Sequence, residues 1–330
     1  MKKDARIYIA GHRGLVGGAI LRNLRSTGFS NLLIKTHGEL DLLNQSAVNG
    51  FFEKERPEYV FLAAAKVGGI GVNSAYPADF IYENTMIGFN VIHSAYKNGV
   101  KKLINLGSSC IYPKLAPQPM KEKYLLSDLL EPTNEAYALA KISVIKLCTY
   151  YNRQYGTNYL SVMPTNLYGL GDNYDLDGSH VLPALIRKFH EAKISGSDKV
   201  ILWGDGSPRR EFLFSDDLAE ALIMLMQNYN ACDLSNSAGD FVNIGSGRDL
   251  TIRELAEKIC YVVYEETSNR TCAIEWDTAK PNGAPQKLLD ISRITALGFS
   301  PKISLSDGIK LAYRDFVKAF SSNGIDVCKD

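Results

Sequence analysis

The sequence has almost no net charge, few cysteines and no long apolar run. Its 37 lysine and arginine residues nearly match its 36 aspartate and glutamate residues, which leaves a formal charge of +1. A general nucleic-acid binder carries a basic excess, so this balance argues against that class, although a few cations suffice for a small anionic ligand. With 45% hydrophobic and 22% charged residues, the composition also excludes a disordered or collagen-like chain.

The cysteines show neither the CxxC spacing of a metal site nor a dense disulfide pattern. They are Cys110, Cys148, Cys232, Cys260, Cys272 and Cys328. We therefore expect reduced thiols and no metal. The apolar run at residues 7–10 is too short for a signal peptide, and the run at 59–65 stops at a charge long before it spans a membrane. The sequence thus predicts a soluble, cytoplasmic protein.

Short β-rich runs alternate with helical patterns through the first half of the chain. We expect strands at residues 7–10, 32–34, 59–62, 103–106 and 159–163, and helices at 19–25, 46–55, 80–97 and 136–155. This alternation predicts an α/β fold, a Rossmann-type doubly wound parallel sheet, over residues 1–167. After Pro164 the sequence becomes rich in Gly, Asp, Asn and Ser, and a helix over 180–192 follows.

A smaller C-terminal α/β domain is therefore expected over residues 168–330. The segment near 211–246, with a helix over 216–228, is expected to pack back on the first domain. The sequence contains no internal repeat and no low-complexity segment. The domain boundary is predicted only from the change to a sequence rich in Gly, Asp, Asn and Ser after Pro164.

A glycine-rich turn follows the first predicted strand. Gly11, Gly14 and Gly17 form a GxxGxxG pattern that leads into a helix. The first glycine permits a tight turn, the second lets the backbone approach a pyrophosphate, and the third lets helix and strand pack closely. A glycine triplet alone is weak evidence for a binding site. This triplet lies between a strand and a helix, and the N-terminus of a helix donates N–H groups to phosphate, so its position predicts dinucleotide binding.

The second predicted strand ends in Lys35-Thr36-His37, without the acidic residue that usually holds the ribose of NAD. Arg13 lies in the glycine turn, where its guanidinium can bind a 2′-phosphate. The pattern favours NADP over NAD, and Asp41 is expected to bind the adenine amino group. The alternative that Arg13 and Lys35 are only solvated remains open.

Tyr137 and Lys141 form a YxxxK pair whose side chains leave one face of a helix. A phenol, with a reference pKa near 10, is a poor proton shuttle at neutral pH, and we expect the lysine ammonium to lower it. Upstream, Ser108 and Ser109 follow a predicted buried strand, where a hydroxyl can bond a substrate oxygen. YxxxK occurs by chance in many helices, but with the glycine turn and the serine pair it predicts a reductase site.

Longer motifs accompany these residues. They are KVGGI at 66–70, SSCIYP at 108–113, EPTNEAYALAK at 131–141, MPTNLYG at 163–169, SHVLPALIRKFHEA at 179–192 and WGDGSPRREFL at 203–213. Over residues 7–290 the chain resembles the extended short-chain dehydrogenase/reductase family and, within it, the GDP-L-fucose synthases. The resemblance implies an NADPH-dependent oxidoreductase with epimerase activity. Such an enzyme inverts C3 and C5 of GDP-4-keto-6-deoxy-D-mannose and reduces the C4 ketone to give GDP-L-fucose.

The resemblance also implies the roles of five catalytic residues. Ser108, Tyr137 and Lys141 would form the reductive triad, with Tyr137 giving its proton to the C4 oxygen as NADPH delivers hydride. Cys110 and His180 would be the acid–base pair that inverts C3 and C5. A thiol and an imidazole both exchange protons near neutrality, which suits this task.

The implied ligand contacts are more numerous. The cofactor-binding residues are Gly11, Arg13, Gly14, Leu15, Val16, Gly17, His37, Asp41, Leu42, Ala63, Ala64, Lys141, Pro164, Asn166, Leu167 and His180. The substrate-binding residues are Lys188, Trp203, Arg210 and Asn282. Arg209 and Arg210 offer bidentate phosphate recognition beside the aromatic Trp203.

Four positions depart from the pattern of the family. Lys188 and Gln286 stand where the family usually has arginine, and Asn282 stands where it usually has aspartate. His37 replaces a usual arginine near the 2′-phosphate. Because lysine cannot reproduce the fork of arginine, these departures leave the exact sugar and the strength of the NADP preference open.

Several alternatives bear on the function. Sugar 4,6-dehydratases carry an Asp-Glu pair where this chain has Ser109 and Cys110, and sugar 4-epimerases need neither Cys110 nor His180. The same chemistry on a related GDP-4-keto sugar, a 3,6-dideoxyhexose or a 6-deoxyheptose, remains open. A catalytically silent, NADP-sensing regulator typically loses Tyr or Lys of the YxxxK pair, and this chain keeps both.

Assembly is expected to follow the family. Its members pair as homodimers through a four-helix interface, and the helices over 80–97 and 136–155 are the equivalents here. The same apolar positions would also suit packing on the sheet, so the sequence supports this weakly. Neither a nucleic acid nor a membrane is an expected partner.

Overall fold

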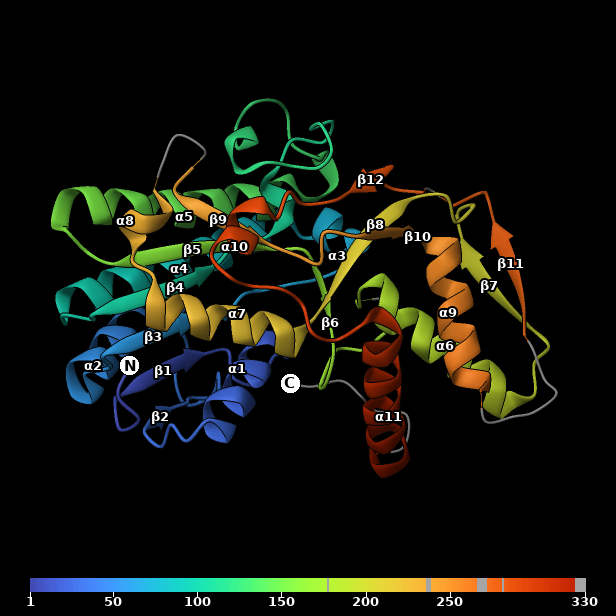
Figure 1. Ribbon diagram of the computed structural model, residues 1–330, viewed down its shortest axis with the longest axis horizontal. Coiled ribbons are helices and arrows are strands. Elements are labelled where there is room, and N and C mark those ends of the chain that lie inside the picture. Colours follow the sequence, from blue (N-terminus) through green and yellow to red (C-terminus); the bar gives the residue numbers. More distant parts are fainter. Residues whose placement is uncertain (177, 236–238, 266–271, 281, 324–330) are drawn as a thin grey trace.

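The protein, described by a computed structural model over residues 1–176, 178–235, 239–265, 272–280 and 282–323, is built on a six-stranded parallel sheet (Figure 1). Its strands are β1 (Ile7–Ala10), β2 (Leu32–Leu33), β3 (Tyr59–Leu62), β4 (Lys102–Leu106), β5 (Tyr159–Pro164) and β9 (Phe241–Ile244). The spatial order β2-β1-β3-β4-β5-β9 is that of a doubly wound sheet, which confirms the predicted fold class.

Helices cover both faces of this sheet. On one face lie α1 (Leu15–Ser26) and α7 (Ser215–Asn228), and on the other lie α2 (Gln45–Glu55), α4 (Pro77–Lys97) and α5 (Glu135–Tyr155). Side chains of β1 alternate between the two layers: Ile7 and Ile9 pack with α1 and α7, while Tyr8 packs with α2. A strand buried on both faces reads as a continuous apolar run, which is why the sequence revealed it.

The remaining strands form smaller sheets beside the large one (Figure 1). β8 (Arg209–Phe214) pairs with β6 (Asn166–Tyr168), β10 (Asp249–Thr251) and β12 (Gln286–Lys287), and β7 (Lys199–Trp203) pairs with β11 (Ala273–Asp277). The helices α6 (Val181–Ser195), α9 (Ile252–Tyr264) and α11 (Leu305–Asn323) share a separate apolar core with these strands. Short helices complete the fold: α3 (Ile70–Ala75), α8 (Ala231–Leu234), α10 (Ser292–Ala296) and 3-10 turns at Ser109–Ile111, Glu122–Tyr124 and Pro132–Asn134.

The chain crosses between the two regions more than once. α7 packs against α1, and β9 is the last strand of the large sheet, whereas β8 lies in the smaller one. The division at residue 167 stays a prediction. Among the described residues no helix is long and apolar enough to cross a membrane. Five of the cysteines are free thiols, and Cys328 lies outside the described residues.

Candidate active site

The carboxyl ends of four parallel strands bring the predicted site residues to one edge of the large sheet. The glycine turn follows β1, Ala63 and Ala64 follow β3, and Ser108 follows β4. Pro164 ends β5, and Asn166 begins β6 directly after it. Ligands bind at this edge in doubly wound sheets, so the fold gathers segments that lie far apart in the sequence.

The glycine turn is packed tightly on one side and open on the other. Gly11 has φ +84°, and a Cβ there would lie 2.7 Å from the Ala64 nitrogen; a Cβ on Gly17 would lie 2.1 Å from the Gly11 oxygen. A Cβ on Gly14 would meet only the Gly11 oxygen, at 3.5 Å. Gly14 caps α1 without a side chain, and the buried His12 Nδ1 has no partner in the described part of the chain. This open, donor-lined turn fits a pyrophosphate.

The turn after β2 carries polar groups near Arg13. The Glu39 carboxylate accepts hydrogen bonds from the Thr36 nitrogen and hydroxyl, each at 2.8 Å. These bonds, chiefly the one from the backbone, lower the pKa of Glu39, and the Arg13 charge contributes. His37 is 83% exposed at its side chain, and its Nδ1 lies 3.9 Å from Asp41 Oδ1. Arg13 and His37 therefore remain available for an anion, while Glu39, which sequence reasoning missed, is already bonded.

Tyr137 and Lys141 lie on α5 next to the end of β4. Lys141 is buried, and its Nζ donates to the Leu106 carbonyl at 3.0 Å and lies 5.7 Å from the centre of the Tyr137 ring. The Tyr137 ring packs edge-on against Phe80 of α4, with centroids 6.2 Å apart. The structure thus brings the YxxxK pair to Ser108, the residue after Gly107 at the end of the same strand.

The expected lowering of the phenol pKa is wrong for this structure. Burial raises the pKa of Tyr137 above its ordinary value, the charge of Cys110 raises it further, and a hydrogen bond with Ser108 opposes both. Burial also lowers the pKa of Lys141 to about 8. Desolvation of the phenol outweighs any effect of the Lys141 charge on its pKa, because Lys141 Nζ is bonded to the Leu106 carbonyl rather than to the phenol. Tyr137 is therefore a protonated donor near neutrality.

Cys110 lies in the 3-10 turn after β4, among polar groups from several elements. Its backbone nitrogen donates to Ser108 Oγ at 3.3 Å, and its sulfur accepts from Asn134 Nδ2 at 3.3 Å. Arg210 on β8 is close enough that Cys110 raises its pKa against the dominant lowering by burial. The Cys110 thiol therefore has an amide donor at hydrogen-bond distance and a cation nearby.

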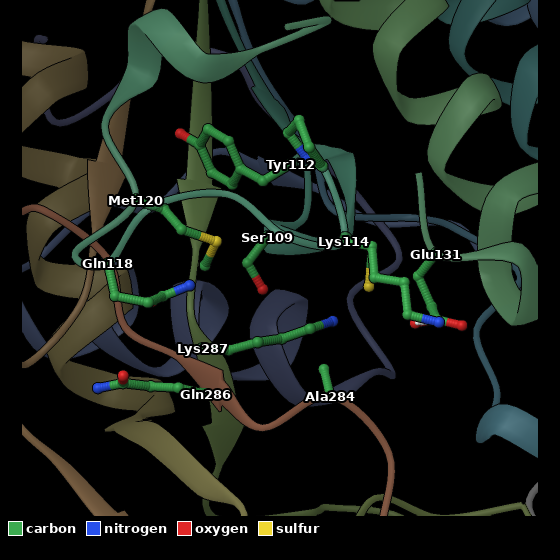
Figure 2. A pocket seen from close by; sticks show the side chains of 11 residues that line it. Ser109, Tyr112, Lys114, Gln118, Met120, Glu131, Ala284, Gln286 and Lys287 are labelled. Carbon is green, nitrogen blue, oxygen red and sulfur yellow. Dashed lines mark ion pairs between the residues drawn. The ribbon is translucent and has the colours of Figure 1, made fainter. Parts of the chain in front are cut away.

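A small pocket beside Cys110 is shown in Figure 2. Lys287 of β12 lies across it, and Lys114 pairs with Glu131 at 3.2 Å on its rim. The pocket is lined by Ser109, Cys110, Tyr112, Pro113, Lys114, Gln118, Met120, Glu131, Ala284, Gln286 and Lys287. Sequence reasoning missed Lys287, because only the pairing of β12 with β8 brings it here.

His180, directly after the loop that contains Gly178, is the N-cap of α6 and makes no side-chain cap hydrogen bond. Desolvation lowers the pKa of its imidazole. The Gly69 nitrogen donates to the Gly178 carbonyl, which ties this loop to the KVGGI segment. No described hydrogen bond joins His180 to Cys110 or Tyr137, so its role rests on the resemblance.

The predicted substrate residues gather around Trp203, which is 65% exposed at the end of β7. Lys188 Nζ lies 5.9 Å and Lys280 Nζ 5.5 Å from the centre of its ring. Asn282 Oδ1 accepts from the Asp205 nitrogen at 2.9 Å and lies against Gly204. The structure therefore unites Trp203, Lys188 and Asn282 on the smaller region, with two cations beside an exposed aromatic face.

Arg209 and Arg210 do not act as the expected pair. Arg209 donates to Asp249 Oδ1 from two nitrogens, at 3.0 and 2.9 Å, and Gln286 donates to the other oxygen of Asp249. Adjacent side chains on a strand point to opposite faces, so only Arg210 faces Cys110. The Arg209–Asp249–Gln286 contact is structural, and Arg210 alone is the phosphate-binding candidate.

The chain is similar to proteins of one enzyme family. The sequence profile of the "NAD dependent epimerase/dehydratase family" matches residues 7–245. The chain is 55% identical over 316 residues to "GDP-L-fucose synthase 1" of Arabidopsis thaliana, covering 96% of this chain and 94% of the relative. It is 52% identical over 315 residues to "GDP-L-fucose synthase" of Escherichia coli, covering 95% and 97%. A GDP-mannoheptose C4 reductase from Campylobacter jejuni, solved with NADP bound, superposes with a TM-score of 0.87 at 42% identity, covering 96% and 99%.

Proposed function

Because the chain belongs to the NAD dependent epimerase/dehydratase family, and within it to the GDP-L-fucose synthases, we propose that it converts GDP-4-keto-6-deoxy-D-mannose to GDP-L-fucose with NADPH. The observation that carries the proposal is Cys110 beside Ser108, Tyr137 and Lys141. A 4-reductase needs the last three alone. A thiol at the same site supplies the acid–base group that inversion of neighbouring carbons requires.

The proposed inversion uses Cys110 and His180. One of them removes the proton from a carbon next to the C4 ketone, and the electron pair moves to the ketone oxygen as an enolate. The other returns a proton to the opposite face of that carbon, and the electron pair moves back. The lowered pKa of His180 favours the neutral imidazole near neutrality, which is the form that can accept a proton.

The proposed reduction uses Tyr137. When bound, NADPH supplies the hydride that C4 accepts. Tyr137 gives its proton to the C4 oxygen, Ser108 hydrogen-bonds that oxygen, and the Lys141 ammonium stabilises the phenolate that remains. The raised pKa of Tyr137 keeps the phenol protonated until that moment. The open turn at Gly14, with Arg13 and His37 nearby, supports NADP as the cofactor.

The direct test supplies GDP-4-keto-6-deoxy-D-mannose and NADPH and follows NADPH absorbance together with the stereochemistry of the product by NMR. We expect NADPH consumption and inverted configuration at C3 and C5. If NADPH is not oxidised at high enzyme concentration with this or any other GDP-keto-sugar, the proposed activity is wrong and the hypothesis of a catalytically silent, NADP-sensing regulator is favoured.

A related substrate is the second candidate, because one of the similar solved structures is a GDP-mannoheptose C4 reductase. Lys188 and Asn282 depart from the family pattern beside Trp203, where the substrate is expected. A panel of purified GDP-4-keto sugars, including a 3,6-dideoxyhexose and a 6-deoxyheptose, separates the two. The highest kcat/KM identifies the substrate.

We also infer a homodimer formed through α4 and α5 and a reducing, cytoplasmic setting. The two helices pack together and leave large apolar side chains exposed: Ile81, Tyr82 and Phe89 on α4, and Leu139, Tyr150 and Tyr155 on α5. Pairing with a second copy would remove these side chains from water. Sedimentation should give a dimer, and Tyr82→Arg with Tyr150→Glu should give a monomer.

A further inference from the structure

Two asparagines occupy the same helical position and use it differently. Asn44 is the N-cap of α2, and its Oδ1 accepts from the Ala47 nitrogen at 3.0 Å, as this residue type commonly does. Asn134 is the N-cap of α5, yet its side chain caps nothing. Its Nδ2 donates instead to the sulfur of Cys110, 24 residues earlier in the chain, at 3.3 Å.

The orientation of Asn134 does not serve local stability. Its Oδ1 is buried and has no partner among the described residues, and a buried acceptor without a donor costs free energy. Turning the side chain back to the helix would satisfy that oxygen and one of the free N–H groups of α5 together. The amide is therefore kept on the sulfur at a structural cost, which is the pattern of a functional contact.

We propose that Asn134 is a positioning residue for Cys110, donating a hydrogen bond that stabilises its thiolate and fixes the sulfur for proton transfer at the sugar carbon. The role in sugar chemistry rests on the proposed function, whereas the hydrogen bond between Asn134 and Cys110 is independent of it. A hydrogen bond to an anionic acceptor is stronger than one to a neutral acceptor, so the amide favours the thiolate over the thiol.

The other charged groups around Cys110 divide by sign. Arg210 on β8 favours the thiolate, and Tyr137 on α5 is neutral near pH 7 because burial raises its pKa. Lys287 on β12 lines the pocket beside Cys110, while Lys114 and Glu131, which line the same pocket, pair with each other. Removing Asn134 leaves all of these in place, so a change in thiol reactivity reports on the amide.

The test measures iodoacetamide alkylation of Cys110 against pH, quantified by mass spectrometry of its peptide. Asn134→Ala should slow alkylation about tenfold near pH 7 and move its pH midpoint upward by about one unit, with the plateau rate at high pH unchanged. Asn134→Asp, which keeps the cap preference but places a carboxylate beside the sulfur, should slow it further. Alkylation of the exposed Cys232 in the same protein should not change.

Asn44→Ala is the matched control. It removes a working cap, so it should lower the melting temperature, while alkylation of Cys110 stays as in the parent protein. Asn134→Ala should change the melting temperature less than Asn44→Ala does. A wild-type pH midpoint in Asn134→Ala would overturn the proposal. If Asn134→Ala fails to fold, Asn134→Leu decides, since leucine has a similar volume, no donor and no charge, and a purely structural role predicts wild-type alkylation there.

A second readout links the contact to the proposed chemistry. In D₂O without NADPH, exchange at C3 and C5 of GDP-4-keto-6-deoxy-D-mannose should slow about tenfold in Asn134→Ala near neutral pH and recover at high pH. No exchange by the parent protein would refute the proposed function but leave the alkylation result standing. Normal exchange in a variant with slowed alkylation would refute the role of Asn134 in catalysis.

Discussion

A buried lysine amine lies at each end of β4, and the two amines have different surroundings. Lys102 begins the strand, and Lys141 contacts the carbonyl of Leu106, which ends it. Burial lowers the pKa of each to about 8. Lys102 Nζ donates to the carbonyls of Leu225, Met226 and Tyr229 at the end of α7, whereas Lys141 Nζ donates to Leu106 alone among the described residues.

The comparison teaches that burial and pKa do not by themselves distinguish a structural lysine from a functional one. An ammonium has three N–H donors, and Lys102 uses all of them on a helix C-terminus, where positive charge is favourable. Lys141 keeps donors for a ligand and lies beside Tyr137. The number of unused donors, which only the fold sets, separates the two.

The largest difference between the two lysines should be in catalysis. Lys141→Met removes the cation proposed to stabilise the Tyr137 phenolate, so NADPH oxidation with the keto-sugar should fall at least about 100-fold. Lys102→Met should leave that rate within about twofold, since it lies at the opposite end of β4. A rate near the parent value in Lys141→Met would remove Lys141 from the proposed mechanism.

In stability we expect the larger loss from the Lys102 variant, the reverse of the order in activity. Lys102→Met removes the side-chain donor of three carbonyls at the end of α7, of which Leu225 keeps the Tyr229 nitrogen as a second donor. Urea unfolding should therefore show a loss of about 2 kcal/mol. The exposed neighbour Lys101, which pairs with Glu58, is the control, and Lys101→Met should change little. Equal losses in the two variants would mean that the helix contact of Lys102 is not stabilising.

The pH dependence of reduction should depend on Lys141 only. Its pKa of about 8 means that the ammonium is present below pH 8 and is lost as the pH rises through that value. The kcat/KM for reduction should therefore fall above about pH 8. Lys141→Arg, which stays charged, should move this fall to higher pH, and Lys102→Met should not move it. An unchanged profile in Lys141→Arg would assign the fall to another group.

The smallest effect expected is coupling between the two ends. Leu106 lies four positions after Lys102 along an extended strand, a distance of about 13 Å. Losses of stability at sites this far apart add within about 0.5 kcal/mol. The double variant Lys102→Met with Lys141→Met should therefore equal the sum of the single variants in urea unfolding. A larger interaction energy would show that β4 transmits strain between the helix end and the site.

Most of the large sheet could be read from the sequence because its strands are buried on both faces and stand out as apolar runs. The expected strands at 7–10 and 59–62 match β1 and β3, and α5 begins one residue before the expected 136. The helix after the glycine turn begins at Leu15 rather than 19, because the turn itself leads directly into it. Local sequence patterns were sufficient to predict these strands and helices, because each element is defined by the residues of a single short segment.

The sequence by itself determined the order of strands and helices, the glycine turn and the presence of Ser108, Cys110, Tyr137 and Lys141, because each depends on neighbouring residues. Tertiary structure alone decided which polar atoms are already bonded. The three carbonyl partners of Lys102 lie 123 to 127 residues away, and Asp249, 40 residues away, turns Arg209 from the site. The pKa of Tyr137 rises rather than falls for the same reason: desolvation is a property of the assembled interior, which no local pattern encodes.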